Sequence, residues 1–196
     1  MTALGLAQQL REHFPNDLSE PVEFRGEVSL ELADAEKIRV VCDTAKRVLG
    51  FDFLLDIASI DNYGNDPRYV VVYELYGIDI RTHLRLKTPV EEEISELPSV
   101  CEVWPTANWH EREVFDMMGI RFRGHPDLRR ILMWEGYPYH PLRKDFPLAG
   151  KSSESADGTF SRPAPMEGGP FVTASDTGDA VAREPRVRMP DETDET

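Results

Sequence analysis

Residues 53–86 decide the fold, and they read FLLDIASIDNYGNDPRYVVVYELYGIDIRTHLRL. Three runs rich in β-branched and aromatic residues predict three β-strands. These runs are Phe53–Ile60, Tyr69–Leu75 and Ile80–Leu86. A cluster of Asn, Gly, Asp and Pro residues at 62–67 marks the first connection, and a short turn at Gly77 marks the second. Connections this short favour an antiparallel meander.

Before these strands, helical and extended patterns alternate. The spacing from Thr2, a possible N-cap, to about Phe14 predicts a first helix. A stronger helix is predicted after its cap at Asp34, and it ends at Gly50. Its apolar stripe comprises Ala35, Ile38, Val41, Cys42, Ala45, Val48 and Leu49. The strands predicted between the two helices are Val22–Phe24 and Val28–Leu32.

After the three strands, the pattern predicts two more helices and one more strand. Thr88-Pro89 followed by Glu91, Glu92 and Glu93 has a cap, a proline and early acids, which predict a helix start. The run Val100–Trp104 predicts a strand. Thr106 or Asn108 caps the next helix, and Gly119 ends it. The predicted fold class is α+β: a mixed, largely antiparallel sheet with helices packed against it, followed by an extended C-terminal arm.

Charge and composition divide the chain into three predicted regions: an α+β core domain at 1–120, an extended basic docking segment at 121–149, and an irregular tail, partner-bound or disordered, at 150–196. The net charge of −14 argues against a general nucleic-acid-binding protein. Lys and Arg outnumber Asp and Glu only in residues 121–150. That basic island suits an acidic partner surface or anionic lipid head groups. An ordinary solvated basic face is the alternative.

Cysteine usage and hydropathy indicate a chain without its own redox cluster. Cys42 and Cys101 belong to no Cys-x-x-Cys pair, so this chain alone cannot hold an iron–sulfur cluster. We expect both to be buried, reduced thiols, as is typical of a reducing cytoplasm. The N-terminus lacks a signal-peptide pattern, and no apolar run approaches the ~20 residues of a membrane helix. The sequence predicts a soluble chain that associates with a membrane only through partners.

The helix expected before Gly119 carries four charged residues, Glu111, Arg112, Glu113 and Asp116. Arg112 and Asp116 are one turn apart, and an exposed pair at this spacing stabilises a helix by only about 0.2–0.5 kcal/mol. One interpretation is therefore a solvated helix face. Another is that Glu113 and Asp116 form a metal or acid–base site with one of three histidines, His110, His125 or His140.

Common catalytic and nucleotide-binding motifs are missing from the sequence. His110-Glu111 resembles the start of a zinc-protease helix, but Val114 stands where that motif needs its second histidine. There is no nucleophile elbow, no Gly-x-Gly-x-x-Gly and no phosphate-binding Gly-x-x-x-x-Gly-Lys loop. The chain has no evident means of binding NAD, flavin or a nucleotide.

The basic region after Gly119 is interrupted by prolines, which favour extended backbone in the residues before them. Its cationic side chains, Arg129, Arg130, Arg143 and Lys144, could pair with carboxylates of a neighbouring subunit. The alternative is that Arg143-Lys144-Asp145 only keeps a loop soluble.

Over residues 33–148, these motifs resemble one family, the C subunit of respiratory complex I, the proton-pumping NADH:quinone oxidoreductase. The family signature is matched by Glu111, Arg112, Glu113, Asp116, Met117, Met118, His125, Arg129, Ile131 and Leu132. A second motif is matched by 140–148, which read HPLRKDFPL. Tyr139 stands where the family usually has glycine, so the local loop is expected to differ.

The resemblance implies a non-catalytic structural subunit of the hydrophilic arm, on the cytoplasmic side of the inner membrane. Its partners would be the D subunit, near the quinone-reducing end, and iron–sulfur subunits. FMN and the clusters would lie on those partners, with no cofactor or metal on this chain. The expected partner-docking residues are Glu111, Arg112, Glu113, Asp116, His125, Arg129, Arg130, His140, Arg143, Lys144 and Asp145.

Three rival functions stay open at this point. The first is the equivalent subunit of a membrane-bound hydrogenase or of a complex fed by a donor other than NADH, because donor-binding chemistry lies on other subunits. The second is a stand-alone metal hydrolase built on the carboxylates and histidines above. The third is a soluble adaptor that belongs to no redox complex.

Overall fold

The structure is a computed structural model that describes residues 2–147. Its elements are α1 (Ala3–His13), β1 (Val22–Phe24), β2 (Glu27–Glu31), the 3-10 turn η1 (Ala35–Lys37), α2 (Ile38–Leu49), β3 (Phe53–Asp61), β4 (Tyr69–Gly77), β5 (Thr82–Val90), β6 (Glu96–Pro98), α3 (Ala107–Met118) and β7 (Arg121–Arg123). The predicted 150–196 tail and most of the C-terminal arm lie outside the described residues.

The main sheet has five strands in the order β1-β2-β5-β4-β3. All neighbouring strands are antiparallel except β2 and β5, which are parallel. Tyr73 at the centre of β4 lies opposite Ile57 of β3 and Leu86 of β5. The α+β class with a mixed, largely antiparallel sheet is therefore confirmed, as are the three strands of the predicted meander.

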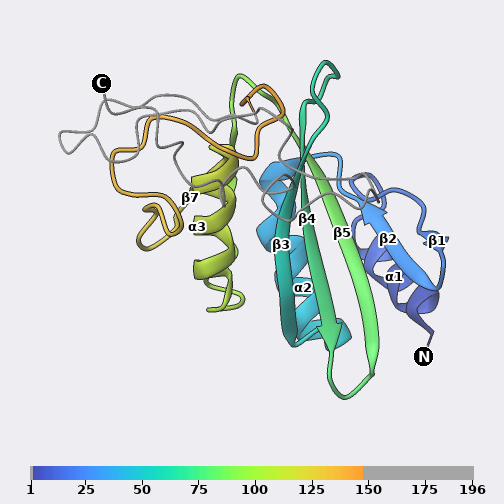
Figure 1. The fold of residues 1–196 in the computed structure, drawn as a ribbon. Helices are drawn as coiled ribbons and strands as arrows, with labels where there is room; N and C mark the ends of the chain where they lie inside the picture. The colour runs from blue at the N-terminus through green and yellow to red at the C-terminus, as the bar shows by residue number, and fades with distance from the viewer. Residues whose placement is uncertain (1, 148–196) are drawn as a thin grey trace, which may run out of the picture. The chain divides into compact units, whose positions relative to one another are not determined.

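Helices α1 and α2 cover one face of this sheet (Figure 1). Thr2 caps α1 by accepting a hydrogen bond from Gly5 N at 3.2 Å, and Asp34 caps the turn η1 that leads into α2. Most of the predicted stripe of α2 is buried, but Val48 is 59% exposed, so its place in that stripe was wrong. Gly50 ends α2 in the left-handed conformation that glycine adopts without steric cost.

Helix α3 lies beside β3, the edge strand of the main sheet (Figure 1). Its position covers an edge that would otherwise offer unpaired backbone groups. His110 of α3 lies 3.1 Å from a carboxylate oxygen of Asp56 on β3. The short strands β6 and β7, which flank α3 in the sequence, pair in parallel as a second small sheet.

Two predicted elements are wrong, for tertiary reasons. No helix begins at Thr88, because β5 continues to Val90 and buries Thr88. Pairing with β2 ends at Lys87, so Pro89 has a strand neighbour on only one side, where proline is tolerated. Likewise 100–104 is a turn rather than a strand. Its three apolar residues, Val100, Val103 and Trp104, are buried at helical spacing.

Candidate docking site

Helix α3 is the scaffold of the candidate site. Thr106 is its N-cap residue, although the threonine side chain makes no capping hydrogen bond. Gly119 ends the helix with φ 78° and donates its N–H to the carbonyl of Phe115 at 2.9 Å. The carbonyls of the last residues of a helix have no partner within the helix, so those of residues 116–118 need donors from elsewhere.

The basic segment after β7 supplies these donors. Arg130 Nη1 and His140 Nδ1 both donate to the carbonyl of Asp116 at 3.0 Å. The backbone N–H of Leu142 donates to Met117 O at 3.1 Å, and Arg143 Nε donates to Met118 O at 2.6 Å. Two guanidinium groups therefore lie at the negative end of the helix dipole, where positive charge is stabilising.

The Asp116 carboxylate fixes the same segment from the side. Its Oδ2 accepts hydrogen bonds from the backbone N–H groups of Ile131, Leu132 and Met133 at 3.0, 2.7 and 2.8 Å. Its Oδ1 accepts from Arg130. Burial alone would raise the pKa of Asp116, but the backbone and Arg130 hydrogen bonds outweigh it, and the pKa lies below its ordinary value.

Arg112 binds backbone carbonyls of the same segment. Its Nε and Nη2 donate to the carbonyls of Arg129 and Arg130, both at 3.1 Å, and its guanidinium lies over the ring of Trp109. Arg112 is only 7% exposed and Asp116 is fully buried. The interpretation as a solvated helix face is therefore wrong for Arg112 and Asp116. Both side chains bind the segment after β7, and they do not pair with each other. Only Glu113 of the four charged residues is exposed.

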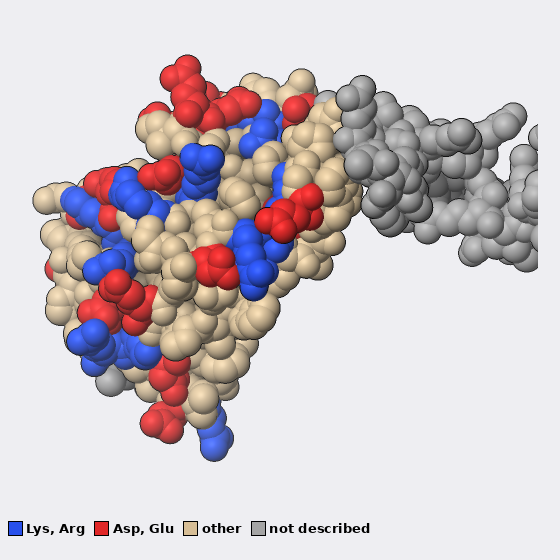
Figure 2. All heavy atoms as spheres, turned by 90° about the vertical axis from the view of Figure 1, so that its left-hand side faces the viewer, with Lys and Arg blue, Asp and Glu red and all other residues tan. Residues whose placement is uncertain are grey.

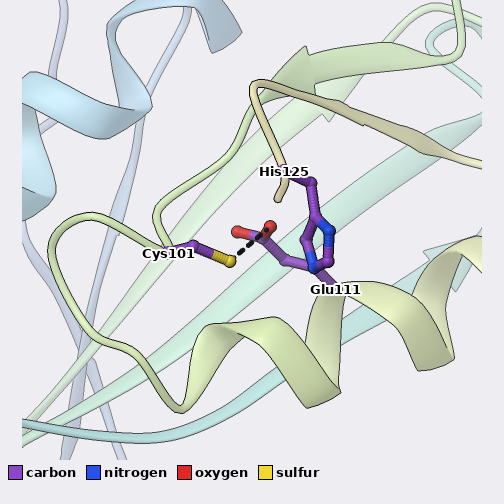
Figure 3. Close-up of side chains that lie close together, drawn as sticks. All are labelled: Cys101, Glu111 and His125. Carbon is purple, nitrogen blue, oxygen red and sulfur yellow. Dashed lines mark hydrogen bonds between the residues drawn. The ribbon is translucent and has the colours of Figure 1, made fainter. Parts of the chain in front are cut away.

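Glu111 points to the opposite side of α3, into the turn after β6. It is fully buried and accepts hydrogen bonds from Ser99 Oγ at 2.6 Å, Val100 N at 2.7 Å and Cys101 Sγ at 3.3 Å. Burial raises its pKa, which its hydrogen bonds only partly offset. His125 lies next to Glu111 and Cys101 (Figure 3).

The alternative interpretation, a metal or acid–base site of Glu113 and Asp116 with a histidine, is wrong. Glu113 is exposed, Asp116 is surrounded by N–H donors, and His110 faces Asp56. Within residues 2–147, the one group with ligand atoms close enough for a metal ion consists of Cys101, Glu111 and His125. Sequence reasoning missed it because Cys101 was expected in a strand, away from the helix.

A second clamp, also missed from the sequence, holds the end of the segment. Arg68 is 6% exposed and donates to Asp61 on β3 at 2.9 and 3.0 Å, and to Asp145 at 2.6 Å. The backbone N–H of Lys144 donates to the same Asp61 carboxylate at 2.8 Å. The hydrogen bond from Arg68 lowers the pKa of Asp61 more than burial raises it. The bonded residues are up to 83 positions apart, so no local pattern predicts them.

The predicted docking residues thus fall into two groups. The described segment is folded back onto the core, where Arg130, His140, Arg143 and Asp145 make internal contacts. The side chains of Arg129 and Lys144 are exposed, and Arg129 pairs with Asp127 at 2.9 Å. The docking role of these residues stays a prediction.

Exposed apolar side chains accompany this surface. They are Trp109 (61% exposed), Leu132 (62%) and Leu142 (62%). Figure 2 faces the α3 side of the molecule and shows charges of both signs among uncharged surface. We call these three residues the apolar patch. All three are attached to α3, because Trp109 lies on it and the backbones of Leu132 and Leu142 are hydrogen-bonded to its residues Asp116 and Met117. Apolar surface patches with polar rims are typical of protein–protein contacts.

Known proteins with similar sequences define the family. Residues 32–152 match the family described as respiratory-chain NADH dehydrogenase, 30 Kd subunit. The C subunit of the NADH-quinone oxidoreductase of Geotalea uraniireducens is 46% identical over 153 residues, 78% of this chain and 93% of the relative. That of Geobacter sulfurreducens is 43% identical over 154 residues, 78% and 94% of the two chains.

Two solved structures have the same fold. A trypsin-resistant fragment (1-134) of Nqo5 has 30% sequence identity and a TM-score of 0.55, covering 63% of this chain and 97% of the fragment. A chain of the membrane-bound sulfane sulfur reductase, an archaeal respiratory membrane complex, has 26% identity and a TM-score of 0.63, covering 74% and 85%.

The chain therefore belongs to the family of C subunits of the peripheral arm of NADH-quinone oxidoreductase, respiratory complex I. Its role is in electron transport, as one member of a multi-subunit complex. Among residues 2–147, no helix is long and apolar enough to cross a membrane.

Proposed function

We propose that this chain is a non-catalytic structural subunit that docks onto the D subunit of its complex, near the quinone-reducing end. FMN and the iron–sulfur clusters lie on partner subunits in this proposal, with no redox cofactor on this chain. The chain keeps those partners at fixed separation while electrons pass from NADH to quinone and protons are translocated. Assembly gives it a peripheral position on the cytoplasmic side of the inner membrane.

The observation that carries the proposal is that α3 binds the backbone of two exposed leucines of the segment after β7. The backbone N–H of Leu132 is held by the Asp116 carboxylate, and that of Leu142 by the carbonyl of Met117. Both side chains nevertheless remain more than 60% exposed. Holding an apolar side chain in place before binding lowers the entropy cost of association. The helix and the segment therefore prepare an apolar anchor for a partner.

Charged side chains around the apolar patch would set orientation. Glu113 is exposed on α3 itself. Arg129 is exposed in the segment, where Arg112 of α3 binds its backbone carbonyl, and Lys144 is exposed near the end of the segment. Exposed charges at the rim of an interface affect association rate and specificity more than affinity. We expect these three residues to guide docking and the apolar patch to supply most of the binding free energy.

The first test is purification of the complex from the native host. The tagged chain is recovered from membranes in mild detergent, its partners are identified, and NADH-dependent quinone reduction is measured. We expect a D subunit, flavin- and cluster-bearing subunits and this activity. Recovery of the chain alone from the cytosol would refute the assembly role and favour the adaptor.

The second test breaks the apolar patch. Leu132→Asp with Leu142→Asp should lower the yield of assembled complex about tenfold or more, because two charges enter a buried contact. Val48→Asp is the matched control, since Val48 is equally exposed but lies on α2. Both purified proteins should keep the wild-type circular dichroism spectrum. Normal assembly of the double variant would show that docking uses another surface.

A complex fed by another electron donor is the second candidate, including a membrane-bound hydrogenase. It is favoured by the structural similarity to a chain of the membrane-bound sulfane sulfur reductase, a respiratory membrane complex that is not named as an NADH-quinone oxidoreductase. Co-purification of a D-type subunit without NADH-dependent quinone reduction would support this candidate over complex I.

A further inference from the structure

Three side chains that are different kinds of metal ligand lie close together beside α3. Cys101 comes from the turn after β6, Glu111 from α3 itself and His125 from the turn after β7. One ligand atom of each lies within 4.8 Å of the other two, and Figure 3 shows the thiol and the imidazole on either side of the carboxylate. The cluster ties together three segments that are separate in the sequence.

The donor set and its spacing suit zinc. Thiolate, imidazole and carboxylate are the three side-chain ligands that Zn²⁺ uses in proteins. Zn–S and Zn–O bonds of ordinary length at a tetrahedral angle place sulfur and oxygen about 3.5 Å apart. Cys101 Sγ and Glu111 Oε2 are 3.3 Å apart, close to that edge of a tetrahedron. The imidazole would need to move inward by about 1 Å.

Glu111 also differs from the other buried carboxylates in residues 2–147. Asp61 and Asp116 are each paired with a guanidinium group, from Arg68 and Arg130. The three hydrogen-bond donors to Glu111 are neutral, and it takes part in no ion pair among the described residues. A buried carboxylate whose hydrogen-bond donors are all neutral is costly, and a divalent cation would supply a full positive charge beside it.

We propose that Cys101, Glu111 and His125 bind one Zn²⁺ ion, which fastens the turns after β6 and β7 to α3. Sulfur binds the metal as thiolate, so the Cys101 proton leaves to solvent. A water molecule completes the coordination, and Ser99 Oγ keeps its hydrogen bond to Glu111. The site is structural and takes no part in electron transfer. It would replace the expectation that this chain carries no metal.

His125 decides how tightly the ion is held. Its Nε2 donates to the carbonyl of Asn108 at 3.1 Å, and its Nδ1 accepts the backbone N–H of Asp127 at 3.0 Å. Metal-bound histidines usually keep one outer hydrogen bond to a carbonyl or carboxylate. One of the two contacts must therefore break on binding. We expect micromolar affinity, weaker than that of a preformed zinc site.

Cobalt titration of the full-length chain tests the site directly. The protein, stripped with a chelator, is titrated with Co²⁺, and Zn²⁺ is then added in competition. We expect one equivalent to bind with a thiolate-to-cobalt charge-transfer band that Zn²⁺ abolishes. Cys101→Ser should lose the band, while Cys42→Ala should keep it, because Cys42 lies in the core between α2 and the sheet. Glu111→Gln should weaken binding at least tenfold.

Cys101→Ser distinguishes a metal site from a clamp, by which we mean a metal-free hydrogen bond from residue 101 to Glu111. A serine hydroxyl at position 101 still donates to Glu111, so a clamp without metal predicts unchanged stability and no effect of Zn²⁺ on the wild-type melting temperature. The metal site predicts that Zn²⁺ raises the melting temperature of the wild type and not of Cys101→Ser. Failure to bind one equivalent at micromolar metal, or a charge-transfer band that survives in Cys101→Ser, would overturn the proposal. Neither result depends on the docking role.

Discussion

The β3–β5 sheet and the segment at 124–145 are stabilised in different ways. In the sheet, backbone pairing runs along three strands with one register shift between Leu54 and Asp56, and alternate residues of β5 are buried. In the segment, no residue belongs to a helix or strand. Its backbone N–H groups donate instead to the Asp116 side chain and the Met117 carbonyl of α3, and to Asp61 of β3.

This difference predicts how each region responds to substitution. The free energy of the sheet is spread over many apolar contacts and ladder hydrogen bonds, so any one contributes a small part. The segment depends on a few buried charges, and removal of one partner leaves the other unpaired in a dry environment. Single substitutions should therefore release the segment while the sheet stays folded, a form of local unfolding.

The largest effect is expected for Asp116→Ala. It removes the acceptor of three backbone N–H groups and the partner of the partly buried Arg130 guanidinium, which should cost about 3 kcal/mol of unfolding free energy or more. Urea denaturation measures the loss. Hydrogen exchange should show lost protection of the amides of residues 131–133 and unchanged protection in β4. The control is Glu113→Ala on the exposed face of α3, expected within about 0.5 kcal/mol.

Arg68→Ala should have the next largest effect. Three carboxylates lose a shared partner, and the most buried of them, Asp61, becomes an unpaired charge. We expect a loss of about 3 kcal/mol, with faster exchange at Lys144 N–H, which is bonded to Asp61. Arg47→Ala, which breaks an exposed pair on α2, should cost no more than about 0.5 kcal/mol. An equal loss in both variants would contradict the distinction between buried and exposed pairs.

The sequence predicted most of the helices and strands well, because their apolar side chains repeat every two to four residues. Strand alternation and the stripe of α2 depend only on neighbouring positions, and Gly50 and Gly119 ended helices as expected. The helix predicted from Thr88 failed because that prediction also used only neighbouring positions. A cap, a proline and early acids are present, but pairing of β5 with β4 overrides these local signals.

The sequence identified residues of the candidate site but not their bonding partners. Both residues of the expected Arg112–Asp116 pair belong to the site, yet each binds a turn that is 15–18 positions away. The exposed i,i+4 rule considers only the helix itself, so it could not find partners outside it. One signal was present: Gly119 ends α3 and leaves carbonyls that need donors, directly before an Arg-rich segment.

A smaller effect is expected where the segment passes closest to α3. A Cβ atom added at Gly119 would lie 2.4 Å from Arg143 Nη2 and 2.6 Å from His140 Nε2, and φ there is +78°. Gly119→Ala should cost about 2 kcal/mol, from the positive φ and from displacement of both side chains. Gly124→Ala isolates the first term, because φ is +83° and nothing lies within 4 Å of its Cβ position. It should cost about 1 kcal/mol. Equal losses would mean that the segment moves aside freely.

The smallest expected effect is on the pH dependence of stability. The folded-state pKa of Asp116 lies below its ordinary value of 3.8, so its contribution is complete above pH 3.8 and is lost as pH falls through the folded pKa. Asp61, also with a lowered pKa, behaves in the same way. Wild-type stability should therefore fall as the pH drops below about 4. Asp116→Asn removes one titrating group, so its unfolding free energy should decline less over the same range. If urea denaturation from about pH 2.5 to 5 gave parallel curves for the two proteins, the carboxylate would not be held as a charged group, and the segment would depend on neutral contacts as the sheet does.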